Sequence, residues 1–321
     1  MNHRARRWVH IPYRQPRSPN SSQGVPVQLG LIGLGRMGSN MRDRLRAAGH
    51  EVVGYDRNPQ VSDVTSLTDL VQQLQAPRVV WIMVPHGAPT RQVLEELGDS
   101  LEADDLVLEG GNSRFTDDRS NAAMLAERGI KYVDVGVSGG VWGAENGYGL
   151  MAGGDTEDIE RAMPIFDALR PPGDRDKGFA HAGPVGAGHY AKMVHNGIEY
   201  GLMQAYAEGF ELLAASEVVT DVPATIKAWS QGTVVRSWLL DLLVRALEED
   251  PELERLRGYV SDSGEGRWTI EESINNAVPT PAITSALFAR FASRQEDSPA
   301  MKAVAALRNQ FGGHSVQSSD E

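Results

Sequence analysis

The chain has 321 residues, no cysteine and a formal net charge of -12 at pH 7. This length predicts two domains, each large enough for an apolar core of its own. The lack of cysteine excludes disulfides and thiolate metal sites and fits a reducing, cytoplasmic compartment, while the acidic charge argues against nucleic acid as a partner. No apolar run approaches the ~18 residues of a membrane-spanning helix, so we expect no insertion into a membrane.

Residues 1–25 differ in composition from the rest of the chain. They contain Arg4, Arg6, Arg7, Arg14 and Arg17, no acidic residue and no apolar signal core. We expect a disordered extension here, and a disordered tail at residues 315–321. Transit peptides share this composition, so organelle import stays open as an alternative, as does an upstream start codon.

A glycine-rich loop follows the first predicted strand. Residues 27–32 (VQLGLI) lead into Gly33-Leu34-Gly35-Arg36-Met37-Gly38 and then into a predicted helix that reaches residue 48. A second predicted strand, 51–55, ends at Asp56. The pattern G-x-G-x-x-G between a strand and a helix, with an acid about 20 residues on, is typical of a dinucleotide-binding turn. We therefore predict that residues 33–38 contact the pyrophosphate of a dinucleotide.

The residues after the second strand bear on which dinucleotide binds. Asp56 can accept hydrogen bonds from the 2′-hydroxyl of the adenosine ribose, and its charge would repel a 2′-phosphate. Arg57 follows directly and could instead bind that phosphate. The prediction is NAD, with NADP as the alternative.

Strands and helices continue to alternate through the first half of the chain. Predicted helices at 66–75, 90–97 and 118–128 precede predicted strands at 79–84, 106–109 and 132–135, respectively. A further βα unit at 148–169 and a short strand near 178–181 follow. The pattern predicts a Rossmann-like α/β domain over residues 26–183, with a doubly wound parallel sheet. Ligands bind beyond the carboxyl ends of such strands, where Asn112 and the turn Ser138-Gly139-Gly140 are expected.

Beyond Gly183-Pro184-Val185-Gly186 the chain is predicted to be all-helical, as a substrate and oligomerisation domain over residues 184–314. Helices are expected at 187–216, 223–230, 237–248, 270–276, 281–293 and 298–310.

The first of these helices carries an unusual polar face. Lys192, His195, Asn196, Glu199 and Tyr200 follow the spacing i, i+3, i+4, i+7 and i+8, which puts them on one side, opposite Met193, Val194, Gly197, Ile198 and Gly201. Five different polar chemistries are not the pattern of an ordinary wet face. Lysine is also rare here, with five against 26 arginines, and unlike arginine it can act as a base. Lys192 and Glu199 would lie about 10 Å apart along the axis, which suits a proton acceptor and a proton donor around a substrate of several carbons.

Several motifs together resemble one known family. They are IGLGRMG with GGNS, GVSGG, GHYAKMVHNGIEYGLMQ, WT followed by FAR, and RNQFGGH. From about residue 27 to residue 314 the chain resembles decarboxylating 6-phosphogluconate dehydrogenase, a β-hydroxyacid dehydrogenase. Family members of the usual length have a larger helical domain, so the chain is similar to the short form, which is thought to prefer NAD. The resemblance implies an oxidoreductase of the pentose phosphate pathway and of gluconate utilization. Its reaction is the conversion of 6-phospho-D-gluconate to D-ribulose 5-phosphate and CO2, with hydride transfer to NAD or NADP.

The resemblance also implies roles for individual residues. Lys192 would be the proton acceptor and Glu199 the proton donor. The carboxylate and hydroxyls of the substrate would be held by Asn112, Ser138, Gly139, Gly140, His195 and Asn196. Its phosphate would be surrounded by Tyr200, Arg290, Arg308 and His314. Arg308 and His314 would come from a neighbouring subunit, which implies a homo-oligomer, dimer or tetramer, with a shared site. The cofactor would contact Gly33, Leu34, Gly35, Arg36, Met37, Gly38, Asp56, Arg57, Asn58, Val84, Pro85, His86 and Asn112.

Two further points follow from the motifs. No cluster of carboxylates has ligand spacing, so we expect no metal, and lysine with other hydrogen-bond donors must polarise the reacting ketone. Where long forms have a phosphate-binding lysine, this chain has Ser263, just ahead of Gly264-Glu265-Gly266-Arg267-Trp268. Arg267 is a candidate for the missing charge.

Two alternatives remain at this point. Another β-hydroxyacid dehydrogenase, acting on 3-hydroxyisobutyrate or tartronate semialdehyde, would share the glycine loop, a Ser-Gly-Gly turn and a helical lysine. It would not need Glu199 or the terminal Arg/His pair. A non-catalytic NAD(H)-sensing module would need neither Lys192 nor Glu199.

Overall fold

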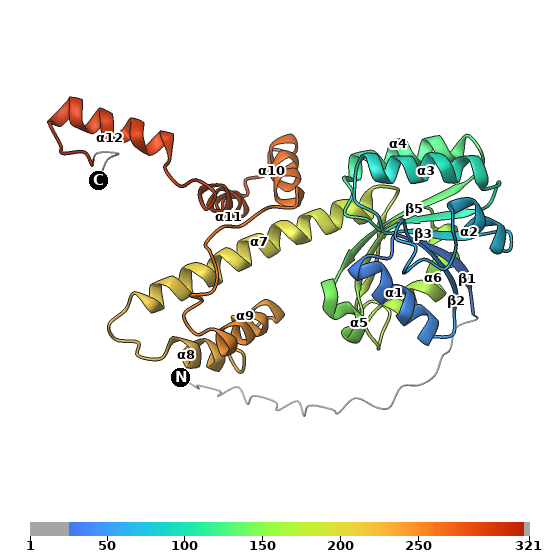
Figure 1. Cartoon of the computed structure of the whole chain (residues 1–321), viewed down its shortest axis with the longest axis horizontal. Helices are drawn as coiled ribbons and strands as arrows, with labels where there is room; N and C mark the ends of the chain where they lie inside the picture. The colour runs from blue at the N-terminus through green and yellow to red at the C-terminus, as the bar shows by residue number, and fades with distance from the viewer. Residues whose placement is uncertain (1–25, 318–321) are drawn as a thin grey trace, which may run out of the picture. The chain divides into compact units, whose positions relative to one another are not determined.

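The computed structural model describes residues 26–317, which form two compact units (Figure 1). The first runs to Ser113 and resumes over Asp117–Gly188, and the second comprises Arg114–Thr116 and the chain from His189 on. The predicted extension at 1–25 and the last residues of the predicted tail, 318–321, lie outside the described residues. In the described part, no helix is both long and apolar enough to cross a membrane.

The first unit is built on a seven-stranded sheet with the order β2-β1-β3-β4-β5-β6-β7. All neighbours are parallel except β5 and β6. The strands are β1 (Gln28–Ile32), β2 (Glu51–Tyr55), β3 (Val79–Ile82), β4 (Leu106–Glu109), β5 (Lys131–Ser138), β6 (Gly149–Gly153) and β7 (Phe179–Gly183). The predicted Rossmann-like fold class is confirmed.

One strand differs in direction from the doubly wound pattern. β6 was predicted as part of a further parallel βα unit, but it runs antiparallel to β5, with Asp134 opposite Gly153 and Ser138 opposite Gly149. The reason is the length of the link. Only residues 139–148 join the two strands, and they form the short helices η1 (Gly140–Trp142) and α5 (Gly143–Asn146). A parallel crossover needs about a dozen residues or more.

Helices cover both faces of the sheet (Figure 1). One face packs on α1 (Arg36–Ala47) and α6 (Thr156–Leu169), and the other on α2 (Leu67–Gln73), α3 (Ala88–Ser100) and α4 (Phe115–Ala126). Successive residues of β3 alternate between these two cores, with Trp81 in the first and Ile82 in the second. Because both faces are buried, the strands are continuous apolar runs.

The second unit is helical. Its elements are α7 (Ala187–Ala214), α8 (Val222–Trp229), α9 (Trp238–Glu249), α10 (Glu265–Asn275), α11 (Pro281–Ala292) and α12 (Pro299–Gly312). Two small apolar clusters hold it together: one joins α7 to α10 and α11 around Leu287, and the other joins the far part of α7 to α8 and α9 around Leu240. Helix α12 has no buried residue.

Helix α10 begins earlier than the sequence predicted. The Gly-Glu-Gly turn was expected to precede a helix at residue 270, but α10 begins at Glu265, after Gly264 with a φ of +94°. Gly266 is helical because of packing: a Cβ there would lie 2.7 Å from the ring of Tyr200. Gly266 is therefore required by the contact between α10 and α7.

Candidate active site

The glycine loop has the geometry that a dinucleotide requires. Gly33 has a φ of +92°, and a Cβ there would lie 2.6 Å from the carbonyl oxygen of Met83. A Cβ on Gly38 would lie 1.9 Å from the carbonyl oxygen of Gly33, so only glycine lets α1 approach β1 this closely. Gly35 has open space at its Cβ position, and no side chain caps the start of α1. The N–H groups of the first turn of α1 are thus available to a pyrophosphate.

Asp56 ties the end of β2 to this loop. Its Oδ2 accepts a hydrogen bond of 2.7 Å from the N–H of Leu34, and its Oδ1 accepts one of 2.8 Å from the N–H of Asn58. The half-buried carboxylate is thereby fixed at the position where a dinucleotide places its adenosine ribose. Arg57 is exposed, and its guanidinium lies 3.4 Å from the side-chain oxygen of Gln92. Residues 33–38 and 56–58 together fit a dinucleotide, with Leu34 and Met37, which pack on the core, limited to main-chain contacts.

The other predicted loops of the first unit lie at the same edge of the sheet. Strands β1, β3, β4 and β5 are parallel, so residues 84–86, Asn112 and Gly139-Gly140 follow strand ends that point the same way. Gly139 and Gly140 have φ angles of +133° and +52°, which favour glycine. Ser138, predicted as a turn residue, is the last residue of β5.

Helix α7 carries the predicted catalytic pair. Lys192 is buried, and its Nζ lies 3.3 Å from Oε1 of Glu265, which is also buried. Glu199 and Asn196 are half-buried, whereas His195 is exposed with its Nδ1 3.1 Å from Oδ1 of Asn196. The predicted polar face is therefore graded from buried to exposed.

The opposite, apolar face of α7 is less buried than predicted. Met193 is buried, and Gly197 allows close packing, since a Cβ there would lie 2.8 Å from the side chain of Thr269 on α10. Ile198, on the same apolar face, is 53 % exposed. Helix α10 therefore covers the part of this face that carries Met193 and Gly197 and leaves Ile198 open.

Tyr200, Ser263 and Arg290 form a second polar group in the helical unit. The N–H of Ser263 donates a hydrogen bond of 3.2 Å to the Tyr200 hydroxyl, whose oxygen also lies 3.3 Å from Ser263 Oγ. The guanidinium carbon of Arg290 lies 3.5 Å from the centroid of the Tyr200 ring, and its Nη1 donates to the carbonyl of Ser261. Tyr200 and Arg290 are thus in contact, as their predicted common role requires.

Arg267 has a different partner. Its Nε and Nη2 donate to the two oxygens of Asp262, at 2.6 and 3.1 Å, and Arg294 donates to the same carboxylate at 2.8 Å. Hydrogen bonding to Arg267, with a contribution from Arg294, lowers the pKa of Asp262 to about 2. The charge of Arg267 is therefore matched by Asp262, and this weakens its case as a replacement for the lysine of the long forms.

Arg308 and His314 lie on α12 and just after it, and both are exposed. The main-chain oxygen of His314 accepts a hydrogen bond of 2.9 Å from the side chain of Asn309. Within residues 26–317, no hydrogen bond joins either of them to Tyr200 or Arg290. Their predicted role concerns a neighbouring subunit, so it stays a prediction.

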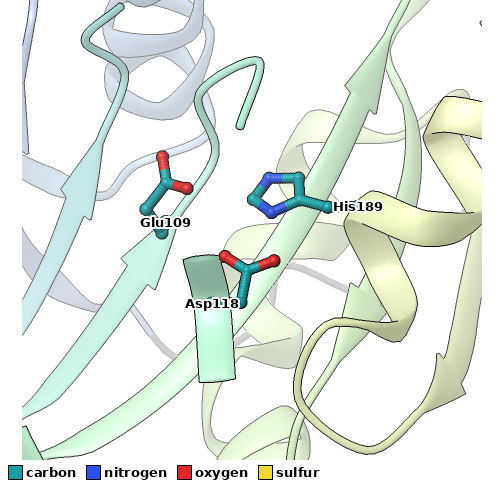
Figure 2. Close-up of side chains that lie close together, drawn as sticks. All are labelled: Glu109, Asp118 and His189. Atoms are coloured by element: carbon teal, nitrogen blue, oxygen red, sulfur yellow. The ribbon is translucent and has the colours of Figure 1, made fainter. Parts of the chain in front are cut away.

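Sequence reasoning missed one cluster of possible metal ligands, because its members are far apart in the chain. Figure 2 shows Glu109, Asp118 and His189, whose ligand atoms lie within 4.8 Å of one another and are all buried. Two carboxylates and an imidazole can bind a divalent cation. Here Asp118 accepts a hydrogen bond of 2.8 Å from the hydroxyl of Tyr132, and Glu109 accepts one of 2.8 Å from the N–H of Gly111. Burial, and then the charge of Asp118, raise the pKa of the Tyr132 hydroxyl well above its usual range. These hydrogen bonds make the cluster part of a buried polar network of the fold.

Comparisons with known proteins agree with the predicted family. Residues 28–171 match the NAD binding domain of 6-phosphogluconate dehydrogenase, and residues 188–321 match the 6-phosphogluconate dehydrogenase C-terminal domain. The NAD(+)-dependent, decarboxylating 6-phosphogluconate dehydrogenase of Haloferax volcanii is 41 % identical over 307 residues, which cover 92 % of this chain and 100 % of that protein.

Two solved structures share the fold. 6-Phosphogluconate dehydrogenase of Plasmodium falciparum has a TM-score of 0.77 at 23 % identity, covering 92 % of this chain and 67 % of that one. A 3-hydroxyisobutyrate dehydrogenase of Mycobacterium tuberculosis has a TM-score of 0.66, also at 23 % identity, covering 88 % of this chain and 100 % of that one. The matches to the two family domains and the full-length match to the Haloferax enzyme confirm the predicted family: the chain belongs to the 6-phosphogluconate dehydrogenases.

Proposed function

We propose that this protein oxidises and decarboxylates 6-phospho-D-gluconate to D-ribulose 5-phosphate and CO2, with NAD as hydride acceptor and NADP as an alternative. The observation that carries the proposal is the buried Lys192 on α7, two helical turns before Glu199, in a chain of this family. NAD, when bound, takes up the hydride from C3 of the substrate. The proposal places the enzyme in the cytoplasm, which holds both phosphorylated sugar acids and dinucleotides.

Lys192 moves the proton of the C3 hydroxyl. Its neutral amine accepts that proton as the hydride leaves C3, and the product is a 3-keto acid. The ketone is beta to the carboxylate, so the electron pair of the breaking C–C bond passes into an enol as CO2 leaves. The Lys192 ammonium donates a proton to the ketone oxygen in this step, and the resulting amine takes it back when the enol returns to a ketone. Each such transfer contributes about 10²–10⁴ in rate.

Glu199 acts on the carbon that carried the carboxylate. In its protonated form it delivers a proton to this carbon as the enol collapses, which gives ribulose 5-phosphate. The separation of seven residues, about 10 Å along the helix axis, leaves room for the substrate between the two groups. Asn112, Ser138, Gly139 and Gly140 at the sheet edge, with His195 and Asn196, are proposed to hold the substrate carboxylate and hydroxyls.

The substrate phosphate is assigned to Tyr200 and Arg290. Arg290 lies against the Tyr200 ring, its Nη1 donates to the main-chain carbonyl of Ser261, and its Nη2 lies 4.0 Å from Sδ of Met203. Thioether sulfur is a weak acceptor, so a phosphate can replace it as the partner of Nη2. Ser263, at the position of the lysine in long forms, is exposed and supplies a hydroxyl in place of a positive charge. A phosphate site without this lysine needs positive charge from another part of the protein.

We infer that Arg308 and His314 supply this charge from a neighbouring subunit. Helix α12 exposes Met301, Val304, Leu307 and Phe311, with Leu307 69 % and Phe311 95 % exposed. Their spacing of three and four residues forms one apolar stripe, which is suited to packing against a second copy. Arg308 is next to Leu307 and would be carried into the contact.

Heterodimers test the shared site. Lys192→Met and Arg308→Ala chains are each expected to be nearly inactive. When they are unfolded and refolded together, a mixed dimer has one site with both residues intact, so about a quarter of wild-type activity should return. A failure to regain activity, with mixed dimers verified by mass, would overturn the shared site.

A Leu307→Asp variant, which puts a charge on the apolar stripe of α12, should be monomeric by sedimentation at micromolar concentration.

The reaction itself is tested by product analysis. The purified protein is supplied with 6-phosphogluconate and either NAD or NADP, and the reduced cofactor and CO2 are both measured. One CO2 is expected per reduced cofactor, with a higher kcat/KM for NAD. A higher kcat/KM for gluconate or 3-hydroxyisobutyrate, or reduced cofactor without CO2, would overturn the assignment.

A further inference from the structure

The carboxylate next to Lys192 has no role in the scheme above. Glu265 is 1 % exposed, and its Oε1 lies 3.3 Å from Nζ of Lys192. Its other oxygen, Oε2, is buried and accepts no hydrogen bond within the described part of the chain. A buried carboxylate with an unused oxygen is costly to a fold, so its presence beside Lys192 points to a task.

The fold holds Glu265 firmly in this place. It is the first residue of α10, where the helix dipole stabilises a negative charge. The hydroxyl oxygen of Thr269, one turn later, lies 2.9 Å from the main-chain oxygen of Met193 on α7 and 2.8 Å from that of Glu265, and the two carbonyls share its single O–H. Two glycines, Gly197 on α7 and Gly266 on α10, remove the side chains that would separate the helices. The contact between α7 and α10 therefore fixes the distance between the amine and the carboxylate.

We propose that Glu265 is the positioning residue of the proton acceptor: it orients the Lys192 amine and stabilises the positive charge that forms when Lys192 takes the C3 proton. This proposal rests on the proposed function and adds a third residue to it. Glu265 would touch neither the substrate nor the cofactor.

The charges explain why this would accelerate the reaction. Before proton transfer, a neutral amine and a carboxylate carry one negative charge together; afterwards, an ammonium and a carboxylate form a neutral pair. A buried site favours the neutral pair, so the carboxylate interacts more strongly with the product of proton transfer than with the reactant. The ammonium gains a donor in this step, and Oε2 is the acceptor in place for it. The interaction grows along the reaction coordinate, as electrostatic catalysis requires.

A purely structural ion pair predicts something else. Such pairs contribute little net stability, and breaking one destabilises the fold without a specific effect on one chemical step. A positioning role predicts that a change at Glu265 lowers kcat and leaves KM and stability nearly unchanged. A structural role predicts that the same change lowers stability.

The test is Glu265→Gln, which keeps the shape and removes the charge. We expect kcat with 6-phosphogluconate and NAD to fall about 10²-fold, with KM changed less than about threefold. Substrate deuterated at C3 should show a larger isotope effect on kcat than in the wild type, because the oxidation step becomes more rate-limiting. Glu265→Asp, which restores the charge on a shorter side chain, should regain part of the loss. Glu272→Gln, on the same helix, where the carboxylate accepts hydrogen bonds from Asn275 and Asn276, should match the wild type.

A second measurement needs no turnover. The chain has five lysines, so protein labelled with ¹⁵N-lysine gives a simple side-chain spectrum, in which Lys192 is assigned by its absence from Lys192→Arg. Glu265→Gln should move the Lys192 resonance and leave those of Lys131, Lys177, Lys227 and Lys302 in place. A wild-type protein inactive on 6-phosphogluconate would overturn the proposed function, while the spectrum would still report on the pair.

Two results would overturn the inference. One is a Glu265→Gln enzyme whose kcat stays within about twofold of the wild type. The other is a Glu265→Gln enzyme in which the fall in kcat is matched by a rise in KM and accompanied by a lower melting temperature, with no recovery of kcat in Glu265→Asp.

Discussion

The two units present their candidate functional groups in different ways. In the sheet unit, the predicted cofactor loop offers mainly main-chain groups, namely glycines at strand ends and N–H groups at the start of α1, and the carboxylate of Asp56 is held by two main-chain hydrogen bonds. In the helical unit, the groups proposed for the chemistry are side chains on α7, α10 and α11, and two small apolar clusters support these helices. Substitutions of these side chains in the helical unit should therefore change kcat more than the stability of the fold. Substitutions in the sheet unit should change cofactor binding or stability.

The largest effect is expected for Lys192→Met. Methionine fills the same buried volume but cannot accept a proton, so kcat should fall at least ~10³-fold while NAD still binds. Stopped-flow absorbance of the reduced cofactor measures the loss of hydride transfer, and a fluorescence titration measures whether NAD still binds. Lys227→Met is the matched control, because Lys227 is exposed and paired with Glu248. Turnover near the wild-type level in Lys192→Met would refute the scheme.

Glu199→Gln should have the next largest effect, and at a different step. Loss of the proton donor should slow steady-state turnover about 10²-fold, whereas hydride transfer stays fast. A rapid first turnover of reduced cofactor should then precede a slow steady state. If the first turnover were slowed as much as the steady state, Glu199 would not be the later proton donor.

Asp56→Asn probes the sheet unit. The amide oxygen can still accept one main-chain hydrogen bond, but the negative charge is lost. We expect kcat/KM for NAD to fall about tenfold, as for a charge-assisted hydrogen bond, and kcat/KM for NADP to rise. Asp43→Asn on α1, where the carboxylate is exposed, controls for the loss of a charge. If the ratio of the two kcat/KM values did not change, Asp56 would not determine the preference for NAD over NADP, and Arg57 would be the next candidate.

The smallest effect concerns stability and pH. Burial lowers the pKa of His50, whose Nδ1 accepts a hydrogen bond of 3.1 Å from the N–H of Val27. The unfolded chain takes up this proton below the usual histidine pKa of about 6.5, and the folded chain does so only at lower pH. The contribution to stability is therefore complete above about pH 6.5 and is lost as the pH falls below it. The melting temperature should drop by a few degrees between pH 7.5 and 5.5.

His50→Asn keeps a hydrogen-bond acceptor without the titration, so its melting temperature should depend less on pH. His195→Asn, at an exposed residue of α7, should leave the pH dependence unchanged. An equal pH dependence in the wild type and His50→Asn would assign the effect to other groups.

Part of the candidate site could be predicted because its signals are local. The glycine loop, the acid after β2 and the polar face of α7 each lie within a few turns or one strand, where chain geometry alone sets the spacing. The extent of packing was less predictable. Ile198 lies on the apolar face of α7 and is exposed, because which part of such a face is covered depends on the element that packs against it.

The sequence by itself determined the fold class, the family, the dinucleotide loop and the position of Lys192 and Glu199 on one helix, since all of these follow from local periodicity and contiguous motifs. Only the tertiary structure decided the contacts between distant segments. It placed Glu265 against Lys192, 73 positions away, paired Arg267 with Asp262, and gathered Glu109, Asp118 and His189. The antiparallel direction of β6 is different, because it follows from a local feature, the short link that joins β6 to β5. The contacts between distant segments depend on how helices and strands pack, and packing has no signature in a short window of sequence.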